Sequence, residues 1–286
     1  MRPEPRRGLS LLDAAHLLDP ALWVRDRLGL SPDPWQEEAL RSLAAEVYIL
    51  AARQSGKTET MAWRVAHLLA HYNGATCIAI APSQRQSAEL VRRTASALDR
   101  AEVALEVRNA YGLETRHGSR LIAVPGGEDA AGARGYTAAL VVVDEGCFTA
   151  EAVVAAVRPM LAVTRGTFVA ISSAGPAASW FARRWQESVE DPAVLRLSIT
   201  ADLNPRILPD FLARERRALG EARFAAEYLN VFSTPGSRWF DADSLERLFG
   251  APTMGPEPDE VEADTPGRPA LPQRDVHNLF NARRSA

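Results

Sequence analysis

The chain has 286 residues, 47% of them hydrophobic and 24% charged, which is the composition of an ordinary soluble globular protein. Its net charge of −3 excludes the broad basic field of many nucleic-acid-binding proteins, so any contact with DNA must be local. No stretch approaches the roughly 20 apolar residues that would span a bilayer, so a membrane protein is not expected.

The first third of the chain predicts helices that lead into one buried strand. Residues 8–30 carry leucines at helical spacing, and Asp33–Pro34 is a good start for a second helix, since proline suits the first helical turn. The short apolar run 47–52 suits a buried parallel strand. A glycine-containing turn follows, and then a helix over 58–72 that is expected to end near Asn73–Gly74.

Strands and helices then alternate along the middle of the chain. Buried strands are expected at 75–82, 138–146 and 166–175, with a helix over 83–100 and short strands within 103–124. This alternation predicts an α/β fold with a mainly parallel sheet that is covered by helices on both faces. After residue 200 the pattern changes to two short helices over 209–232, which have the size of a small lid.

The chain contains one lysine, Lys57, among its 33 basic residues. Lys57 stands in ARQSGKT, directly after the strand at 47–52, and the stretch fits the phosphate-binding pattern G-x-x-x-x-G-K-[ST] with Ala51 in place of the first glycine. Gly56 lets backbone N–H groups surround phosphate oxygens, and Lys57 supplies a compact charge where a planar guanidinium would not fit. The hydroxyl of Thr58 can reach Mg²⁺.

These features predict that the loop binds ATP, with Mg²⁺ as the second cofactor. The loop residues predicted to bind ATP are Gln54, Ser55, Gly56, Lys57 and Thr58. The alternative is a chance GKT tripeptide after a strand. A single lysine in this position of an otherwise lysine-free chain argues against chance.

A second motif, LVVVDE at 140–145, is a buried strand that ends in two carboxylates. Asp144 is predicted to hold Mg²⁺ together with Thr58, and Glu145 to polarise the attacking water as the general base. The alternative is a strand followed by a solvated acidic turn. The phosphate-binding loop earlier in the chain favours the catalytic interpretation.

Together the motifs resemble the ATPase domain of the large terminase subunit of tailed bacteriophages. The matching stretches are PWQEEAL, ARQSGKT, GARGYTAALVVVDE, FVAISSAG, NPRI and RFAAEYLNVF. The resemblance implies a P-loop NTPase fold and an ATP-hydrolysing motor that translocates double-stranded DNA into a procapsid. It also implies a homo-oligomeric ring on the portal, a small terminase subunit as partner, and a place in the cytoplasm of the bacterial host.

The resemblance gives roles to three further residues near the loop. Trp35 is expected to stack on adenine, and Gln36 to hydrogen-bond to the edge of the base; the alternative for Trp35 is a hydrophobic anchor at a helix start. Arg53 resembles the arginine that neutralises the charge of the γ-phosphate within the same subunit. Its alternatives are a surface arginine and an ion pair at the end of the strand.

Three more residues are given roles by the family motifs. Arg134 matches an arginine that reaches the ATP of a neighbouring subunit, where a guanidinium stabilises charge on the transferring phosphoryl group. Its alternative is to brace its own loop through Glu128 or Asp129. Ser172 and Ser173 resemble the motif that couples hydrolysis to motion, and the alternative is that they cap the helix after Gly175.

The sequence patterns divide the chain into four expected segments. They are an N-terminal helical segment (1–33), a P-loop ATPase core (34–200), a helical lid (201–249) and a disordered, proline-rich acidic tail (250–286). Full-length large terminases continue into a nuclease domain, and nothing after Gly250 reads as one. A motor without its own nuclease is therefore expected, with a separate nuclease as a candidate partner.

Two other functions compete with the motor. One is a truncated prophage remnant or a regulatory ATP-binding subunit without motor activity, but the intact catalytic residues favour the enzyme. The other is a two-domain helicase, which would need a second similar domain. The arginine pairs 92–93 and 183–184 are open to two interpretations, a contact with DNA phosphates or an ordinary solvated helix face.

Overall fold

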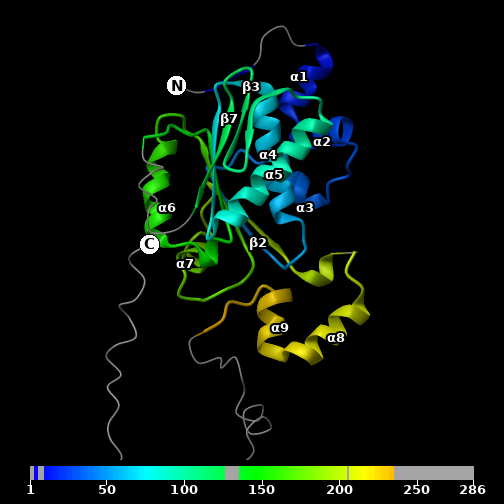
Figure 1. The fold of residues 1–286 in the computed structure, drawn as a ribbon. Coiled ribbons are helices and arrows are strands. Elements are labelled where there is room, and N and C mark those ends of the chain that lie inside the picture. The colour runs from blue at the N-terminus through cyan, green and yellow to red at the C-terminus, as the bar shows by residue number, and fades with distance from the viewer. Residues whose placement is uncertain (1–2, 6–9, 126–134, 205, 235–286) are drawn as a thin grey trace, which may run out of the picture. The chain divides into compact units, whose positions relative to one another are not determined.

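The computed structural model describes residues 3–5, 10–125, 135–204 and 206–234 (Figure 1). The predicted tail over 250–286, the later part of the segment 201–249, and Arg134 with its alternative partners Glu128 and Asp129 lie outside these residues. None of the described helices is long and apolar enough to cross a membrane.

Within the described residues, the central sheet has eight strands. Their order is β10 (Val194–Ile199), β2 (Glu46–Ala51), β9 (Thr167–Ser172), β8 (Leu140–Asp144), β4 (Thr76–Ala81), β7 (Arg120–Pro125), β6 (Gly112–Thr115) and β5 (Leu105–Asn109). The strands from β10 to β7 all pair in parallel, whereas β6 pairs antiparallel with both β7 and β5. The predicted mainly parallel sheet is confirmed.

Helices cover both faces of this sheet, as the alternation predicts (Figure 1). One face carries α4 (Lys57–His71) and α5 (Gln84–Arg100), and further out α1 (Leu11–Leu18), α2 (Pro20–Leu28) and α3 (Pro34–Arg41). The other face carries α6 (Glu151–Val157) and α7 (Trp180–Glu187). A small antiparallel pair, β1 (Glu4–Pro5) with β3 (Tyr72–Asn73), lies outside the main sheet.

The apolar strands form two separate cores because successive side chains on a strand point to opposite faces. On β2, Val47 and Ile49 belong to the core under α4 and α5, whereas Tyr48 and Leu50 belong to the core under α6 and α7. All five residues of β8 are buried in the same alternating way. This burial of both faces explains why these strands read as continuous apolar runs in the sequence.

Two elements of the core are absent from the predictions made from sequence. Strand β10 pairs in register with β2 from Val194–Glu46 to Ile199–Ala51, and it is the edge strand on that side of the sheet. Helix α7 begins at Trp180, after Ser179 accepts a hydrogen bond from the backbone N–H of Ala182. β10 is only partly buried, so its pattern is less apolar than that of the central strands.

Two short helices, α8 (Pro209–Leu219) and α9 (Glu221–Tyr228), form the pair expected over 209–232, and we call these two helices the lid. Figure 1 shows them in yellow and orange, beyond the end of β2 and apart from the helices that cover the sheet. No residue of α8 is buried, and Phe224 is the buried residue of α9. The lid therefore depends on contacts with the end of the sheet for its position.

Candidate active site

The phosphate-binding sequence forms a tight loop, residues 52–56, between the end of β2 and the start of α4. Gly56 has a φ of +90°, and a side chain at this position would come within 3.0 Å of the amide nitrogen of Gln36. Both the backbone angle and the space require glycine here. Lys57 follows as the first residue of α4 and is 8% exposed, so its ammonium group lies at a helix N-terminus where anions are favoured.

The predicted loop and the predicted acidic pair meet in the structure. The Nζ atom of Lys57 lies 3.3 Å from Oε1 of Glu145. The hydroxyl of Thr58 donates a hydrogen bond to Oδ2 of Asp144 at 2.9 Å. Because β9 lies between β2 and β8 in the sheet, these side chains come together over the end of β9.

Asp144 is the most deeply buried acid of the site, with 5% exposure. Burial and, secondarily, the charge of Glu145 raise the pKa of Asp144 to about 6, although Lys57 and Thr58 act in the opposite direction. A carboxylate in this position gains from any cation that arrives beside it. With the hydroxyl of Thr58, it offers the oxygen ligands that Mg²⁺ prefers.

Glu145 adopts an unusual backbone conformation directly after β8. Its φ is +53°, a left-handed value that costs free energy for a residue with a Cβ atom. The side chain is held from two sides, by Lys57 and by the hydroxyl of Ser173, which donates to Oε2 at 3.3 Å. The strained backbone therefore coincides with a carboxylate that is held over the phosphate loop.

Ser172 and Ser173 connect the end of β9 to the acidic pair. The hydroxyl oxygen of Ser172 accepts a hydrogen bond from the backbone N–H of Cys147 at 3.1 Å, while Ser173 contacts Glu145. The alternative role of these serines, capping the following helix, is wrong, because Ser179 caps α7. Their role in coupling stays a prediction.

Arg53, which follows β2, forms an ion pair with Glu227 in α9 of the lid. The backbone N–H of Arg53 also donates to the carbonyl oxygen of Glu227 at 3.4 Å. Of the alternatives considered for Arg53, the structure therefore contains an ion pair at the end of the strand. Its action on a γ-phosphate stays a prediction, and the partner Glu227 was not predicted.

Gln36 lies behind the phosphate loop and is 4% exposed. Its Oε1 atom accepts a hydrogen bond from the backbone N–H of Asp33 at 2.8 Å, and its Nε2 atom donates to the hydroxyl of Thr60 at 2.9 Å. Trp35 is partly buried and packs against the core under α4 and α5. The predicted contacts of Trp35 and Gln36 with adenine are untested, and both side chains already have structural partners.

The structure also describes Gln54 and Ser55, and their predicted contacts with ATP stay predictions. Gln54 has a φ of +59°, and its carbonyl oxygen accepts a hydrogen bond from Nδ2 of Asn204 at 3.3 Å. Ser55 is 3% exposed, and its hydroxyl has no hydrogen-bond partner within the described residues. A buried hydroxyl without a partner beside Gly56 and Lys57 is available to a ligand in the loop.

Three residues that the sequence did not single out attach the segments on either side of the lid to the loop, to β2 and to α3. Asn204 contacts Gln54, and Nδ2 of Asn230 donates to the carbonyl oxygen of Leu50 at 3.0 Å. Arg206 forms a paired contact with the carboxylate of Asp33 at the start of α3. The stretches NPRI and YLN, which contain these residues, were recognisable only as family motifs without a stated role.

The two arginine pairs are engaged in ion pairs. Arg92 and Arg93 both contact Glu89, and Arg93 also contacts Glu59; Arg183 contacts Glu151, and Arg184 contacts Glu46. A contact with DNA stays a prediction for both pairs.

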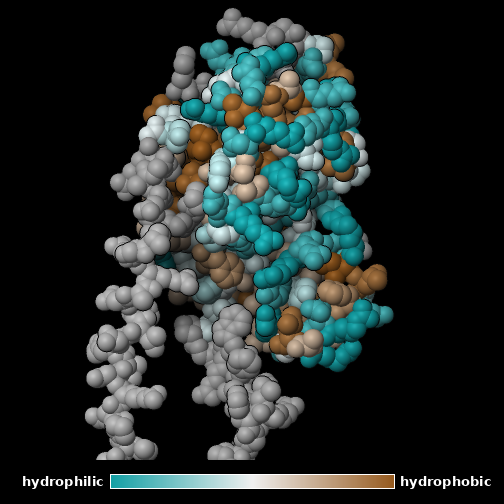
Figure 2. Space-filling view, viewed as in Figure 1, coloured by the Kyte–Doolittle hydropathy of each residue, from teal (hydrophilic) through white to brown (hydrophobic). Residues whose placement is uncertain are grey.

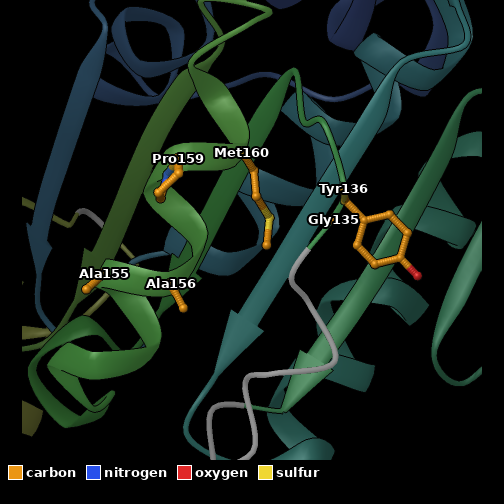
Figure 3. A pocket seen from close by; sticks show the side chains of 6 residues that line it. All are labelled: Gly135, Tyr136, Ala155, Ala156, Pro159 and Met160. Atoms are coloured by element: carbon orange, nitrogen blue, oxygen red, sulfur yellow. The ribbon is translucent and has the colours of Figure 1, made fainter.

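A separate cavity of about 410 Å³ lies on the face that carries α6 (Figure 3). The residues that line it are Gly135, Tyr136, Ala155, Ala156, Pro159 and Met160. None of these described lining residues carries a charged side chain, and Lys57, Asp144 and Glu145 are not among them.

A family model described as "Terminase large subunit, T4likevirus-type, N-terminal" matches residues 48–247. The chain belongs to this terminase family. The match includes the phosphate loop, the acidic pair and the lid, so the site of this terminase lies inside the matched region.

Solved structures share the fold of this terminase. The large terminase ATPase domain of Thermus phage P74-26 has 22% sequence identity and a TM-score of 0.65, with 76% of this chain and 100% of that chain covered. The large terminase of a thermophilic bacteriophage, solved in complex with ATP-gamma-S, has 15% identity and a TM-score of 0.57, with 76% and 52% covered.

The large terminase of bacteriophage HK97 has 15% identity and a TM-score of 0.60, with 76% of this chain and 55% of that chain covered. This terminase chain thus spans about half the length of the HK97 protein and of the terminase solved with ATP-gamma-S. The mainly parallel sheet and these similarities give it the P-loop NTPase fold of terminase ATPase domains. No curated protein matches the sequence.

Proposed function

We propose that this terminase chain is an ATP-hydrolysing motor that translocates double-stranded DNA into a procapsid. The observation that carries the proposal is the meeting of Lys57, Glu145 and Asp144 over the end of β9, with the hydroxyl of Thr58 on Asp144. This arrangement offers a cation for phosphate, a carboxylate for a metal and a second carboxylate for water. The similarity to a terminase solved in complex with ATP-gamma-S supports nucleotide binding.

The contact between Lys57 and Glu145 suggests how binding prepares the site. The ammonium group of Lys57 now neutralises Glu145 from 3.3 Å away. Phosphate oxygens in the loop would compete for the same ammonium group. Glu145 would then keep its contact with Ser173 and become free to accept a proton from the attacking water.

The residues present fit a Mg²⁺ ion. Asp144 and the hydroxyl of Thr58 are the oxygen ligands that would hold it, and the remaining ligands would be phosphate oxygens and water, as is usual for this metal. When bound, the metal supplies positive charge that stabilises the transferring phosphoryl group. Its binding also favours the ionised form of Asp144, whose pKa burial has raised.

The wider assembly follows from membership of the family and belongs to the same proposal. The chain would act as a homo-oligomeric ring on the portal, with a small terminase subunit as partner. Arg134, which lies outside the described residues, would reach the nucleotide of a neighbouring subunit. Ser172 and Ser173 would transmit changes at Glu145 to β9, since they connect the two.

The test compares the wild-type chain with Lys57→Ala and Lys57→Arg. Wild-type protein should bind and hydrolyse ATP with Mg²⁺, and it should translocate DNA when procapsids and the small subunit are added. Both variants should lose ATP binding while circular dichroism shows an unchanged fold. Lys57→Arg is the matched control, because it keeps the positive charge and changes only the shape of the cation.

Normal ATP affinity in folded Lys57→Ala would contradict the assignment of the phosphate loop. ATP binding without any turnover, in the presence of the complete packaging mixture, would contradict the motor. That second result would support a regulatory ATP-binding subunit instead.

A further inference from the structure

Gln36 of α3 and Thr60 of α4 form a buried polar contact behind the phosphate loop. Figure 2 shows mainly hydrophilic residues on the surface over α3 and α5, but Gln36 and Thr60 are only 4% and 0% exposed. The Nε2 atom of Gln36 donates a hydrogen bond to the hydroxyl of Thr60 at 2.9 Å. Buried polar side chains are costly unless they are bonded, so the partners of this pair show what it holds in place.

Thr60 extends the contact to the backbone of the phosphate loop. Its hydroxyl donates to the carbonyl oxygen of Gly56 at 2.9 Å, and its backbone N–H donates to the same oxygen at 2.9 Å. The amide group of Gln36 also lies against Gly56, since a side chain at Gly56 would come within 3.0 Å of Nε2. The carbonyl group of Gly56 is therefore held in one direction, along α4.

The direction of this carbonyl group decides the direction of a donor for phosphate. In a planar trans peptide unit, the C=O of Gly56 and the N–H of Lys57 point in opposite directions. Because the carbonyl points along α4, the N–H of Lys57 points out of the helix N-terminus, where an anion is favoured. Gly56, with its φ of +90°, rotates more freely than any other residue would. Support of its carbonyl group therefore keeps this donor in place.

The hydrogen bonds behind the loop have one consistent arrangement. The Oε1 atom of Gln36 accepts from the backbone N–H of Asp33 at 2.8 Å, which leaves its Nε2 atom to face Thr60. The hydroxyl of Thr60 has a single hydrogen, which goes to Gly56, so it must accept from Gln36. Asp33 is itself held, since its carboxylate contacts Arg206 in the segment before the lid. No other assignment of donors and acceptors satisfies these groups.

We propose that Gln36 and Thr60 are positioning residues, which keep the phosphate loop in the shape that binds phosphate by holding the carbonyl group of Gly56. This inference rests on the proposed function, because it assumes that the loop binds the phosphates of ATP. It does not depend on where the base of the nucleotide lies. Loss of either side chain should weaken the binding of phosphate groups, whether or not a base is attached to them.

The experiment measures the affinity of the full chain for two probes by calorimetry, Mg²⁺–ATP and Mg²⁺–tripolyphosphate, which lacks the base and the ribose. Thr60→Val keeps the shape of the side chain and removes the hydroxyl. It should weaken the binding of both probes by about fivefold, the affinity ratio that corresponds to a hydrogen bond of about 1 kcal/mol. Thr60→Ser keeps the hydroxyl and should bind both probes as wild type does.

Thr94→Val is the matched control, because Thr94 makes the same bond in another helix. Thr94 of α5 is 0% exposed, and its hydroxyl donates to the carbonyl oxygen of Leu90, four residues earlier, at 2.9 Å. Thr94→Val should lower stability in urea unfolding and leave the affinity for both probes unchanged. Gln36→Met should weaken both probes by a similar factor to Thr60→Val. The two losses should not add in the double variant, because both act through one carbonyl group.

The outcomes separate this inference from the proposed function. If wild-type protein binds neither probe, the phosphate-loop assignment fails and this inference fails with it. If wild type binds both probes and Thr60→Val does too with full affinity, the inference is overturned while the proposed function stands. An equal loss of affinity in Thr94→Val would also overturn it.

Gln36→Met provides a second decision, which holds even if Thr60→Val does not fold. Weaker binding of both probes supports the positioning role. Weaker binding of ATP with normal binding of tripolyphosphate would overturn it, because Gln36 would then act on the base or the ribose and not on the phosphate loop.

Discussion

Each end of β2 carries a cluster of charged side chains, and the two clusters are built differently. At the amino end, Glu46 contacts two cations, Arg158 and Arg184, and also accepts a hydrogen bond from the hydroxyl of Tyr48 at 2.8 Å. At the carboxyl end, a single cation, Lys57, lies beside two carboxylates, Asp144 and Glu145.

The difference in charge separates a structural cluster from a functional one. At the amino end, Arg158, Arg184 and the hydroxyl of Tyr48 contact both carboxylate oxygens of Glu46. The guanidinium of Arg158 also lies 4.6 Å from the ring centre of Phe168. One cation beside two anions leaves surplus negative charge at the carboxyl end, and burial first, then the charge of Glu145, raise the pKa of Asp144. A site with this surplus is ready to receive a cation, whereas a satisfied cluster only holds elements together.

The largest expected effect is the loss of turnover in Glu145→Gln. Removal of the proposed general base should lower the rate of ATP hydrolysis by about 10²- to 10⁴-fold. ATP binding should be at least as tight as in wild type, because Lys57 no longer has Glu145 as a competing partner. Steady-state turnover and equilibrium binding check this prediction, and loss of binding would show that Glu145 is structural.

A substitution at the amino end of β2 should have the opposite effect, a loss of stability without a loss of turnover. Glu46→Gln leaves Arg158 and Arg184 without their carboxylate and should lower the free energy of unfolding by about 1–3 kcal/mol. Turnover per folded molecule should stay near the wild-type value. Urea unfolding measures the first effect. A strong loss of turnover in fully folded Glu46→Gln would mean that the two ends of β2 are coupled.

The β2–loop–α4 unit and β8 were predictable because their signals are local. Continuous apolar runs, a glycine with positive φ and a lysine at a helix start lie within 12 residues of one another, from Glu46 to Lys57. The acidic pair was found in the same way, at the end of an apolar strand. Thr58 and Asp144, both predicted to hold the metal, are joined by a hydrogen bond, and their metal binding stays a prediction.

The attachment of the lid could not be predicted, because it depends on side chains that are far apart in the chain. Arg53 and Glu227 are 174 residues apart, and Asn230 and Leu50 are 180 residues apart. No periodicity or spacing connects such positions, and a glutamate on a polar helix resembles any solvated residue. Strand β10 was not predicted for a related reason. An edge strand buries less of its surface, so its sequence is less apolar than that of the central strands.

The two ends of the sheet should also respond oppositely to pH. His67 lines a cavity at the starts of β8 and β9, and burial, the first of several causes, lowers its pKa from 6.5 to about 3. Between these values the unfolded chain binds a proton and the folded chain does not. His67 therefore adds stability that is present above pH 6.5 and is lost as pH falls, by about 1.4 kcal/mol per pH unit.

In metal-free protein, Asp144 has the opposite effect on how the free energy of unfolding depends on pH. Its pKa is raised from 3.8 to about 6, so the folded chain binds the extra proton, and stability falls as pH rises between these values. Urea unfolding between pH 4 and 6 should thus show a steeper rise with pH in Asp144→Asn and a fall with pH in His67→Gln. Parallel curves for wild type and His67→Gln would mean that His67 is protonated in the fold.

The smallest expected effect concerns Glu227. The ion pair with Arg53 is largely exposed, with 65% of the Arg53 side chain accessible, so Glu227→Gln should change the free energy of unfolding by less than about 1 kcal/mol. If Arg53 leaves Glu227 to contact phosphate, the variant should bind ATP up to about fivefold more tightly. An energy of about 1 kcal/mol corresponds to about a fivefold ratio of dissociation constants. Weaker ATP binding would instead show that Glu227 positions Arg53 for the ligand.

The lid has a consequence for how this protein can vary, because the segment that contains it begins and ends beside the carboxyl end of β2. The backbone N–H of Ala52 donates to the carbonyl oxygen of Ile199 at 2.9 Å, and Asn230 donates to the carbonyl oxygen of Leu50. Each doubling of a closed loop costs only about 0.6 kcal/mol. Residues 200–229 can therefore be lengthened, shortened or exchanged as a cassette while the sheet keeps its register, which lets selection change the lid without rebuilding the core.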